Sequence, residues 1–100
     1  MPRQEADQAH CATKLKVLAD STRLSIVRAL MNGPQHVGRL NEEIDIDQSL
    51  LSHHLRVLRE SGLVRSERDG KAVLYDLASK VKMRPRKKGL QLGCCVLSFE

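Results

Sequence analysis

The sequence predicts a mainly α-helical domain with a β-hairpin, which is the architecture of a winged helix-turn-helix. Two short amphipathic helices, over residues 36–44 and 48–61, are separated only by a tight turn. Two extended runs, residues 63–68 and 71–77, then flank Asp69-Gly70, a dipeptide that favours tight hairpin turns. A hairpin placed directly after a helix-turn-helix is the wing of this fold.

The residues before this motif are expected to form two further helices. Residues 1–5 look frayed, and small or apolar residues then recur at helical spacing as far as residue 19: Ala6, Ala9, Ala12, Leu15 and Leu18. This narrow stripe suits close contact with another helix. Asp20 or Ser21 caps the next helix, whose buried stripe is Leu24, Val27, Leu30 and Met31. Asn32-Gly33-Pro34 ends it, because proline cannot continue a helix.

The helix over residues 48–61 has two different faces. One face is apolar and carries Leu51, Leu55 and Leu58, whereas the other carries Ser49, Ser52, His53, Arg56 and Glu60. Short hydrogen-bonding side chains suit contact with base edges in a DNA groove, and Arg56 suits a phosphate. The alternative is an ordinary solvated surface. His54 lies beside Leu50 and Val57, so we expect it to be packed and hydrogen-bonded, and we expect Arg23 to form a structural ion pair.

The hairpin and the residues after it carry much of the basic charge. Arg68 and Lys71 flank the tip of the wing, where they would reach phosphates. Residues 79–88 are basic and contain Pro85, which indicates a linker or a broken helix that either grips flanking phosphates or is simply solvated. Residues 90–99 are apolar, and one face of a helix would hold Leu92, Cys95, Val96 and Phe99. Their alternation favours instead an extended or irregular segment docked on the body or on a partner. We therefore divide the chain into a DNA-binding and dimerisation domain, residues 1–79, and a basic linker with a cysteine-bearing segment, residues 80–100.

Composition excludes several classes of protein. Aromatic residues are only 2% of the chain, too few for a base-stacking platform that binds single strands. The net charge of +5 arises entirely after residue 79, so DNA binding by the body has to rest on local placement of charge. Three cysteines, two of them adjacent, do not form a secreted disulfide framework, and we find no leader or membrane span. We expect a cytoplasmic protein with reduced thiols and no membrane partner.

The chain resembles the ArsR/SmtB family of metal- and stress-sensing repressors. The matching segments are residues 18–30, Ser-His-His-Leu-Arg-Val-Leu-Arg at 52–59, Gly62-Leu-Val64, and the wing through Asp69-Gly70. The resemblance implies a homodimeric repressor, not an enzyme, which an inducer releases from double-stranded operator DNA. It also implies a dimer interface made by the N-terminal helix and the C-terminal segment. Positions that contact DNA in the family match Gln48, Ser49, Ser52 and His53.

The cysteines indicate the inducer. Residues 35–41 contain no cysteine and no histidine follows His54, so two sensor sites known in the family are absent. The pair Cys94-Cys95 looks like the arsenic-sensing members with vicinal cysteines, and soft thiolates select thiophilic ions such as As(III) or Sb(III). As(III) needs three ligands, and we expect Cys11, from either subunit, or a small cellular thiol to supply the third.

Other interpretations remain open at this point. The thiols would also suit Cd²⁺ or Pb²⁺, oxidation or reactive sulfur, and a disulfide from Cys11 to either partner requires the Cα atoms to approach to about 6 Å. Cysteines also often simply pack in a core. A protein-interaction module that uses the helix-turn-helix surface is a further alternative. An enzyme with a thiol nucleophile is disfavoured, because no acid–base constellation surrounds the cysteines.

Overall fold

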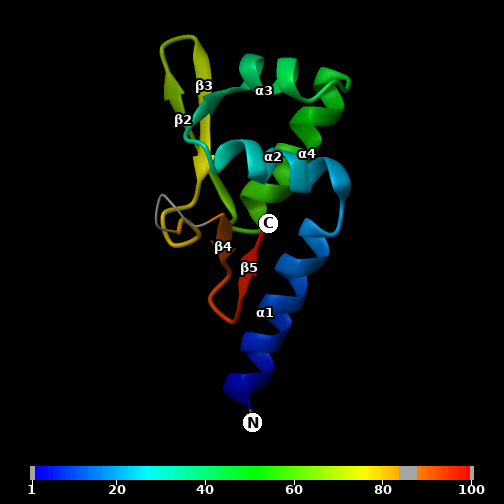
Figure 1. Ribbon diagram of the computed structural model, residues 1–100, viewed down its shortest axis with the longest axis vertical. Helices are drawn as coiled ribbons and strands as arrows, with labels where there is room; N and C mark the ends of the chain where they lie inside the picture. Colours follow the sequence, from blue (N-terminus) through cyan, green and yellow to red (C-terminus); the bar gives the residue numbers. More distant parts are fainter. Residues whose placement is uncertain (1, 84–87, 100) are drawn as a thin grey trace.

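The computed structural model describes residues 2–83 and 88–99, which fold as a winged helix-turn-helix with an added C-terminal hairpin (Figure 1). The helices are α1 (Pro2–Leu18), α2 (Ser21–Leu30), α3 (Val37–Glu43) and α4 (Gln48–Glu60). The strands are β1 (Gln35–His36), β2 (Val64–Asp69), β3 (Ala72–Leu77), β4 (Gly89–Gln91) and β5 (Val96–Ser98). The predicted fold class is confirmed. The wing tip and α3 lie at one end of the molecule, whereas α1 and the β4–β5 hairpin extend toward the other (Figure 1).

The wing is part of a three-stranded antiparallel sheet in the order β1-β3-β2. Asp69 pairs with Ala72, so the two-residue turn is Gly70-Lys71 and not Asp69-Gly70 as the sequence predicted. Gly70 has a φ of 65°, and glycine at the first central position is typical of a type II′ hairpin turn. The prediction of a hairpin was right, but its register was wrong by one residue, because this turn needs positive φ at one position instead of two.

The core is aliphatic, as the composition predicted. It joins the apolar face of α4 to α2 and α3, and its fully enclosed members include Ile26, Leu30, Leu40, Leu51, Leu55 and Leu58. Residues after position 79 join the same core, namely Val81, Leu90 and Leu92. Burial of this kind stabilises by roughly 25 cal/mol per Å² of apolar surface. The C-terminal hairpin therefore docks on the body of the domain.

Aspartates cap both helices that begin after a turn. Asp20 accepts a hydrogen bond of 3.0 Å from the backbone N–H of Arg23, and this bond lowers the pKa of its carboxyl group. Asp47 caps α4, where it accepts bonds from the hydroxyl and the backbone N–H of Ser49 that likewise lower its pKa. Each carboxylate satisfies backbone donors that have no partner inside the helix. The cap at Asp20 was one of the two positions predicted for α2 from the sequence.

The N-terminal part of the fold departs from expectation in two ways. α1 begins at Pro2, whereas residues 1–5 were expected to fray; proline suits the first helical position because its missing N–H has no partner there. The two residues of β1 were expected to be loop and helix, and they form a strand by pairing with β3. The small-residue stripe of α1 lies open in this single chain: Ala9, Ala12 and Leu15 are exposed, and Leu18 is buried.

The segment after β3 resolves the choice between strand and helix. β4 and β5 pair antiparallel, and the hairpin is held to the body by a 2.9 Å hydrogen bond from Gln91 N–H to Val81 O. A Cβ atom at Gly89 would lie 2.6 Å from the carbonyl oxygen of Leu97, so glycine is needed for this close approach. Of the basic run predicted to be a linker, residues 84–87 lie outside the described residues. In the described part of the chain, no helix is long and apolar enough to span a membrane.

An ion-pair cluster joins this segment to the base of the wing. The Asp76 carboxylate, on β3, is only 4% exposed and lies 2.6 Å from Lys82 Nζ. Arg65 of β2, its cross-strand neighbour, lies 3.7 Å from the same oxygen. A buried carboxylate that loses its partner is costly, because desolvation is no longer offset by attraction.

Replacing Lys82 with methionine should therefore lower the free energy of unfolding by about 2 kcal/mol, a value reduced from the buried-pair range because Lys82 is half-exposed. Urea denaturation of Lys82→Met and of Lys80→Met, an exposed control in the same segment, measures the difference. In an Asp76→Asn background, Lys82→Met should lower the free energy of unfolding by less than half as much. An equal loss of stability in both backgrounds would contradict the role of the ion pair.

Candidate DNA interface and cysteine cluster

The polar face of α4 is open to solvent, as the sequence predicted. Gln48, Ser49, Ser52, His53 and Arg56 are all exposed. The Ser49 hydroxyl donates to the Asp47 cap, which leaves its lone pairs free to accept from a base or a water. Arg56 Nε lies 2.9 Å from Glu60 Oε1, one helical turn further along. The exposed stripe can therefore offer hydrogen-bonding groups to the edges of base pairs.

His54 belongs to the interior instead. It is 8% exposed, and its Nδ1 lies 3.4 Å from the guanidinium of Arg23. Arg23 also donates from Nε to the carbonyl of Val17 at 2.7 Å, so it joins the end of α1 to α2 and α4. The prediction of a packed, hydrogen-bonded histidine is confirmed. Arg23 has the structural role that we expected, but its close partners are a carbonyl and a ring nitrogen in place of the expected carboxylate.

Leu50 is an exposed apolar residue of α4 that was not among the predicted DNA contacts. Its side chain is 46% exposed, in the first turn of α4 between the polar stripe and the buried face. The signal was available, because helical spacing places position 50 at the margin of the leucine face. An exposed aliphatic side chain beside the polar stripe is the kind of group that can pack on a thymine methyl group.

The wing tip supplies the basic groups. Arg68 and Lys71 are exposed on either side of Gly70, and Arg68 pairs with Val73 across the hairpin. Figure 1 shows the tip of the β2–β3 hairpin at the same end of the molecule as the N-terminal part of α4. A duplex that accepts α4 in its major groove would meet the wing with its backbone. The two elements together present exposed hydrogen-bonding groups on α4 and exposed basic groups at the wing tip.

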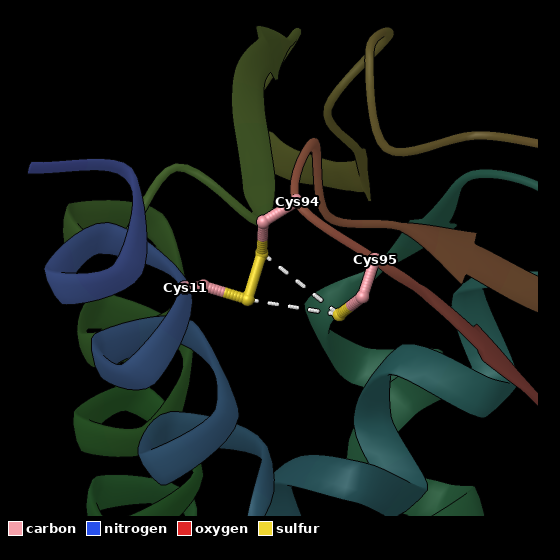
Figure 2. A group of neighbouring side chains, drawn as sticks. All are labelled: Cys11, Cys94 and Cys95. Atoms are coloured by element: carbon pink, nitrogen blue, oxygen red, sulfur yellow. Dashed lines mark hydrogen bonds between the residues drawn. A yellow bond between two sulfur atoms is a disulfide. The ribbon is translucent and has the colours of Figure 1, made fainter. Parts of the chain in front are cut away.

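The three cysteines meet at the opposite end. Cys11 projects from α1, and Cys94 and Cys95 from the connection between β4 and β5 (Figure 2). Cys11 and Cys94 form a disulfide with a Cα–Cα distance of 6.0 Å. The free Cys95 Sγ lies 3.6 Å from Cys11 Sγ and 3.9 Å from Cys94 Sγ. The expectation of reduced thiols is therefore wrong for this structure, because the fold brings the Cα atoms to the spacing that a disulfide needs.

All three sulfur atoms lie within 4.8 Å of one another and come from a single chain. A shallow pocket of about 350 Å³ opens beside them, lined by His10, Lys14 and Leu92 among others. Lys14 Nζ donates to the carbonyl of Leu92 at 3.3 Å, which fixes α1 against the hairpin. Once the disulfide is reduced, the cluster offers three soft donors on one side, which is the donor set that a trigonal metalloid ion requires.

Comparison with known proteins places the chain among bacterial regulators. Residues 20–66, from the cap of α2 into the wing, match the family described as bacterial regulatory protein, arsR family. The chain is 40% identical over 78 residues to the biofilm growth-associated repressor of Agrobacterium fabrum, which covers 78% of this chain and 67% of that protein. The chain belongs to the ArsR family. The matched residues 20–66 contain α2 to α4 but none of the three cysteines.

Other ArsR-family relatives support the same fold. The transcriptional regulator NmtR of Mycobacterium tuberculosis is 43% identical over 76 residues, 76% of this chain, and the match spans 63% of NmtR, less than two thirds of its length. The homodimeric winged helix-turn-helix DNA-binding domain Mb0332 of Mycobacterium bovis superposes with a TM-score of 0.73 at 28% identity, covering 79% of this chain and 73% of the other. Reduced HlyU of Vibrio cholerae superposes with a TM-score of 0.73 at 34% identity, and the match covers 79% of this chain and 83% of HlyU. The family and these relatives are DNA-binding regulators, not enzymes.

Proposed function

We propose that this protein is a homodimeric repressor that binds double-stranded operator DNA and releases it when As(III) or Sb(III) binds to its cysteines. Base edges are read from α4 and phosphates are held from α4 and the wing tip, by Gln48, Ser49, Ser52, His53, Arg56, Arg68 and Lys71. Residues 1–79 bind DNA and dimerise, and residues 80–100 carry the signal in the cytoplasm. The single observation that supports the inducer is the cluster of three sulfur atoms within 4.8 Å.

The chemistry of the inducer step balances without an outside oxidant. A dithiol reductant first supplies two electrons and two protons to the Cys11–Cys94 disulfide and is itself oxidised to a disulfide. The three thiols then condense with arsenous acid: three As–O bonds break, three S–As bonds form, and three molecules of water leave. Soft thiolates make this site selective for thiophilic ions over oxygen-loving cations such as Mg²⁺. The site joins α1 to the C-terminal hairpin, so a bound ion fixes the angle at which α1 leaves the domain.

The exposed stripe of α1 connects this site to DNA release. Ala12 and Leu15 lie open on the same helix as Cys11. The similarity to a homodimeric relative supports a dimer, and this open stripe is the surface that we propose for its interface. A change in the angle of α1 would change the distance between the two α4 helices of the dimer. Operator half-sites lie one helical turn apart, so a changed distance lowers affinity. The dimer thus has two arrangements that differ in the angle of α1, one that fits the operator and one that does not. The metalloid ion binds the second arrangement better and so raises its population.

Arsenite added to the reduced protein–DNA complex should raise the dissociation constant by at least about tenfold, which corresponds to roughly 1.4 kcal/mol of coupling. The probe is a duplex that the reduced protein selects from a random-sequence pool, followed by fluorescence anisotropy. Cys95→Ser keeps two thiols and should lose most of the response, whereas Ser98→Ala, an exposed change in the same hairpin, should keep it. An unchanged response in Cys95→Ser would remove the three-thiol site from the proposal.

The Cys11–Cys94 disulfide favours a second candidate, a thiol-oxidation sensor on the same fold. Hydrogen peroxide would take two electrons and two protons from the thiols, giving one disulfide and two molecules of water. The same anisotropy assay separates the candidates. Release by peroxide with no release by arsenite under reductant would favour the oxidation sensor.

A further inference from the structure

His36 and Asp69 form a contact between the helix-turn-helix and the tip of the wing. His36 Nε2 lies 2.8 Å from Asp69 Oδ2, and both side chains are about half-exposed. An ionised carboxylate only accepts hydrogen bonds, so His36 is the donor. His36 also precedes the first residue of α3, so this contact joins the start of α3 to the last residue of β2.

The register of the sheet explains why the two side chains meet. His36 pairs with Leu74 of β3, and Asp69 pairs with Ala72 of the same strand. Side chains two residues apart lie on the same face of a strand, so both residues project on the face that Ala72 and Leu74 share. Leu74 and Ala72 of the central strand lie on this face, and the histidine ring reaches across β3 to the carboxylate on the neighbouring strand.

The position of Asp69 relates this contact to the basic residues of the wing tip. The wing tip reads Arg68-Asp69-Gly70-Lys71, so one carboxylate lies between the two basic residues that would meet phosphates. A carboxylate free to turn outward would repel the DNA backbone at short range. The hydrogen bond from His36 holds this carboxylate toward the helix-turn-helix, away from the outer edge of the tip.

We propose that His36 is a positioning residue for DNA binding: it holds Asp69 inward and orders the wing tip so that Arg68 and Lys71 can reach phosphates. This inference rests on the proposed DNA-binding function and extends it to residues that do not themselves contact DNA. An exposed pair of this kind is weak, about 1 kcal/mol or less in isolation. The expected effect is therefore a loss of about threefold to tenfold in DNA affinity rather than an abolition.

Four proteins test the proposal: wild type, His36→Ala, Asp69→Asn, and the double variant. Each is measured by anisotropy with a duplex selected from a random pool and across a range of salt concentrations. His36→Ala should weaken binding by about threefold to tenfold and reduce the slope of log affinity against log salt by about one, because one phosphate contact is lost. Asp69→Asn removes the charge, and asparagine is tolerated in such turns. In this background, removing His36 should change the affinity by less than about twofold.

A measurement on the free protein makes the inference independent of the DNA result. In ¹⁵N relaxation, the amides of Gly70 and Lys71 should become more mobile in His36→Ala than in wild type, with His10→Ala as a matched control at the far end of the molecule. Faster motion without any change in affinity would overturn the positioning role while keeping the contact. An equal effect of His36→Ala with and without Asp69 would overturn the proposal itself, since a general destabilisation would not depend on the carboxylate. If His36→Ala still binds DNA, even with reduced affinity, the proposed DNA-binding function stands whether or not the positioning role of His36 does.

Discussion

Replacing Ser52 and His53 together with alanine should weaken binding to operator duplex by about a hundredfold or more. Each side chain is exposed on the polar face of α4 and has groups free to bond with base edges. A lost base contact costs roughly 1–3 kcal/mol, and separate contacts add approximately, so the pair accounts for a factor of this size. Because neither side chain contributes to the buried leucine face, the free energy of unfolding should change little.

The measurement is fluorescence anisotropy at a fixed salt concentration, with a selected duplex and a random duplex side by side. The loss of affinity should be large for the selected duplex and small for the random one. The random duplex is held mainly by phosphate contacts, which carry no sequence information and stay intact in the variant. The matched control is His10→Ala with Ser98→Ala, the same two changes at exposed positions outside the polar stripe of α4. Wild-type affinity in the Ser52 and His53 variant would mean that this face of α4 does not read DNA.

The helix-turn-helix could be predicted because its signals are local. Leu51, Leu55 and Leu58 repeat at helical spacing, and Asp47 provides a cap, so α4 is specified by its own residues. The wing was predicted from Asp69-Gly70, yet its register was not. The turn lies one residue later than predicted because strand pairing along the whole hairpin, from Val64 to Leu77, decides which residues are central.

Features that depend on contacts between distant residues could not be predicted. β1 has only two residues and exists because β3 pairs with it, and Val81 is buried because the C-terminal hairpin covers it. The cysteines were predicted in part. The family resemblance already placed Cys11 near Cys94 and Cys95, but only the fold shows that one chain supplies all three sulfur atoms and brings Cys11 to 3.6 Å from Cys95. Asp69 and His36 are 33 residues apart, so no spacing rule pointed to their contact.

Reduction of the Cys11–Cys94 disulfide should lower the free energy of unfolding by about 4 kcal/mol. The bond closes a loop with a sequence separation of 83 residues, and it restricts the unfolded chain more strongly the longer the loop. For a domain of this size such a loss is a large share of the total stability. Guanidinium denaturation with and without reductant measures this loss of stability directly. The dependence of the unfolding free energy on guanidinium concentration should also change, because the reduced unfolded chain is more expanded.

Cysteine variants identify which bond is responsible. Cys11→Ser should be as unstable as the reduced wild type and should not respond to reductant. Cys95→Ser, which removes the neighbouring free thiol, should keep the full response. A response that disappears in Cys95→Ser would show that the stabilising bond uses Cys95 instead of Cys94, and equal stability of the oxidised and reduced wild type would contradict the disulfide altogether.

The same denaturation experiment tests the metalloid site without DNA. A ligand that binds only the folded state stabilises it by an amount that grows with its concentration, about 2.7 kcal/mol at a hundred times its dissociation constant. Arsenite added to the reduced wild type should therefore recover much of the stability lost on reduction, because it joins α1 to the hairpin again through Cys11, Cys94 and Cys95. Reduced Cys95→Ser retains two of the three donors and should recover far less. Equal recovery in the two proteins would show that arsenite binds through a pair of thiols, and Cys95 would then be free for thiol chemistry of its own.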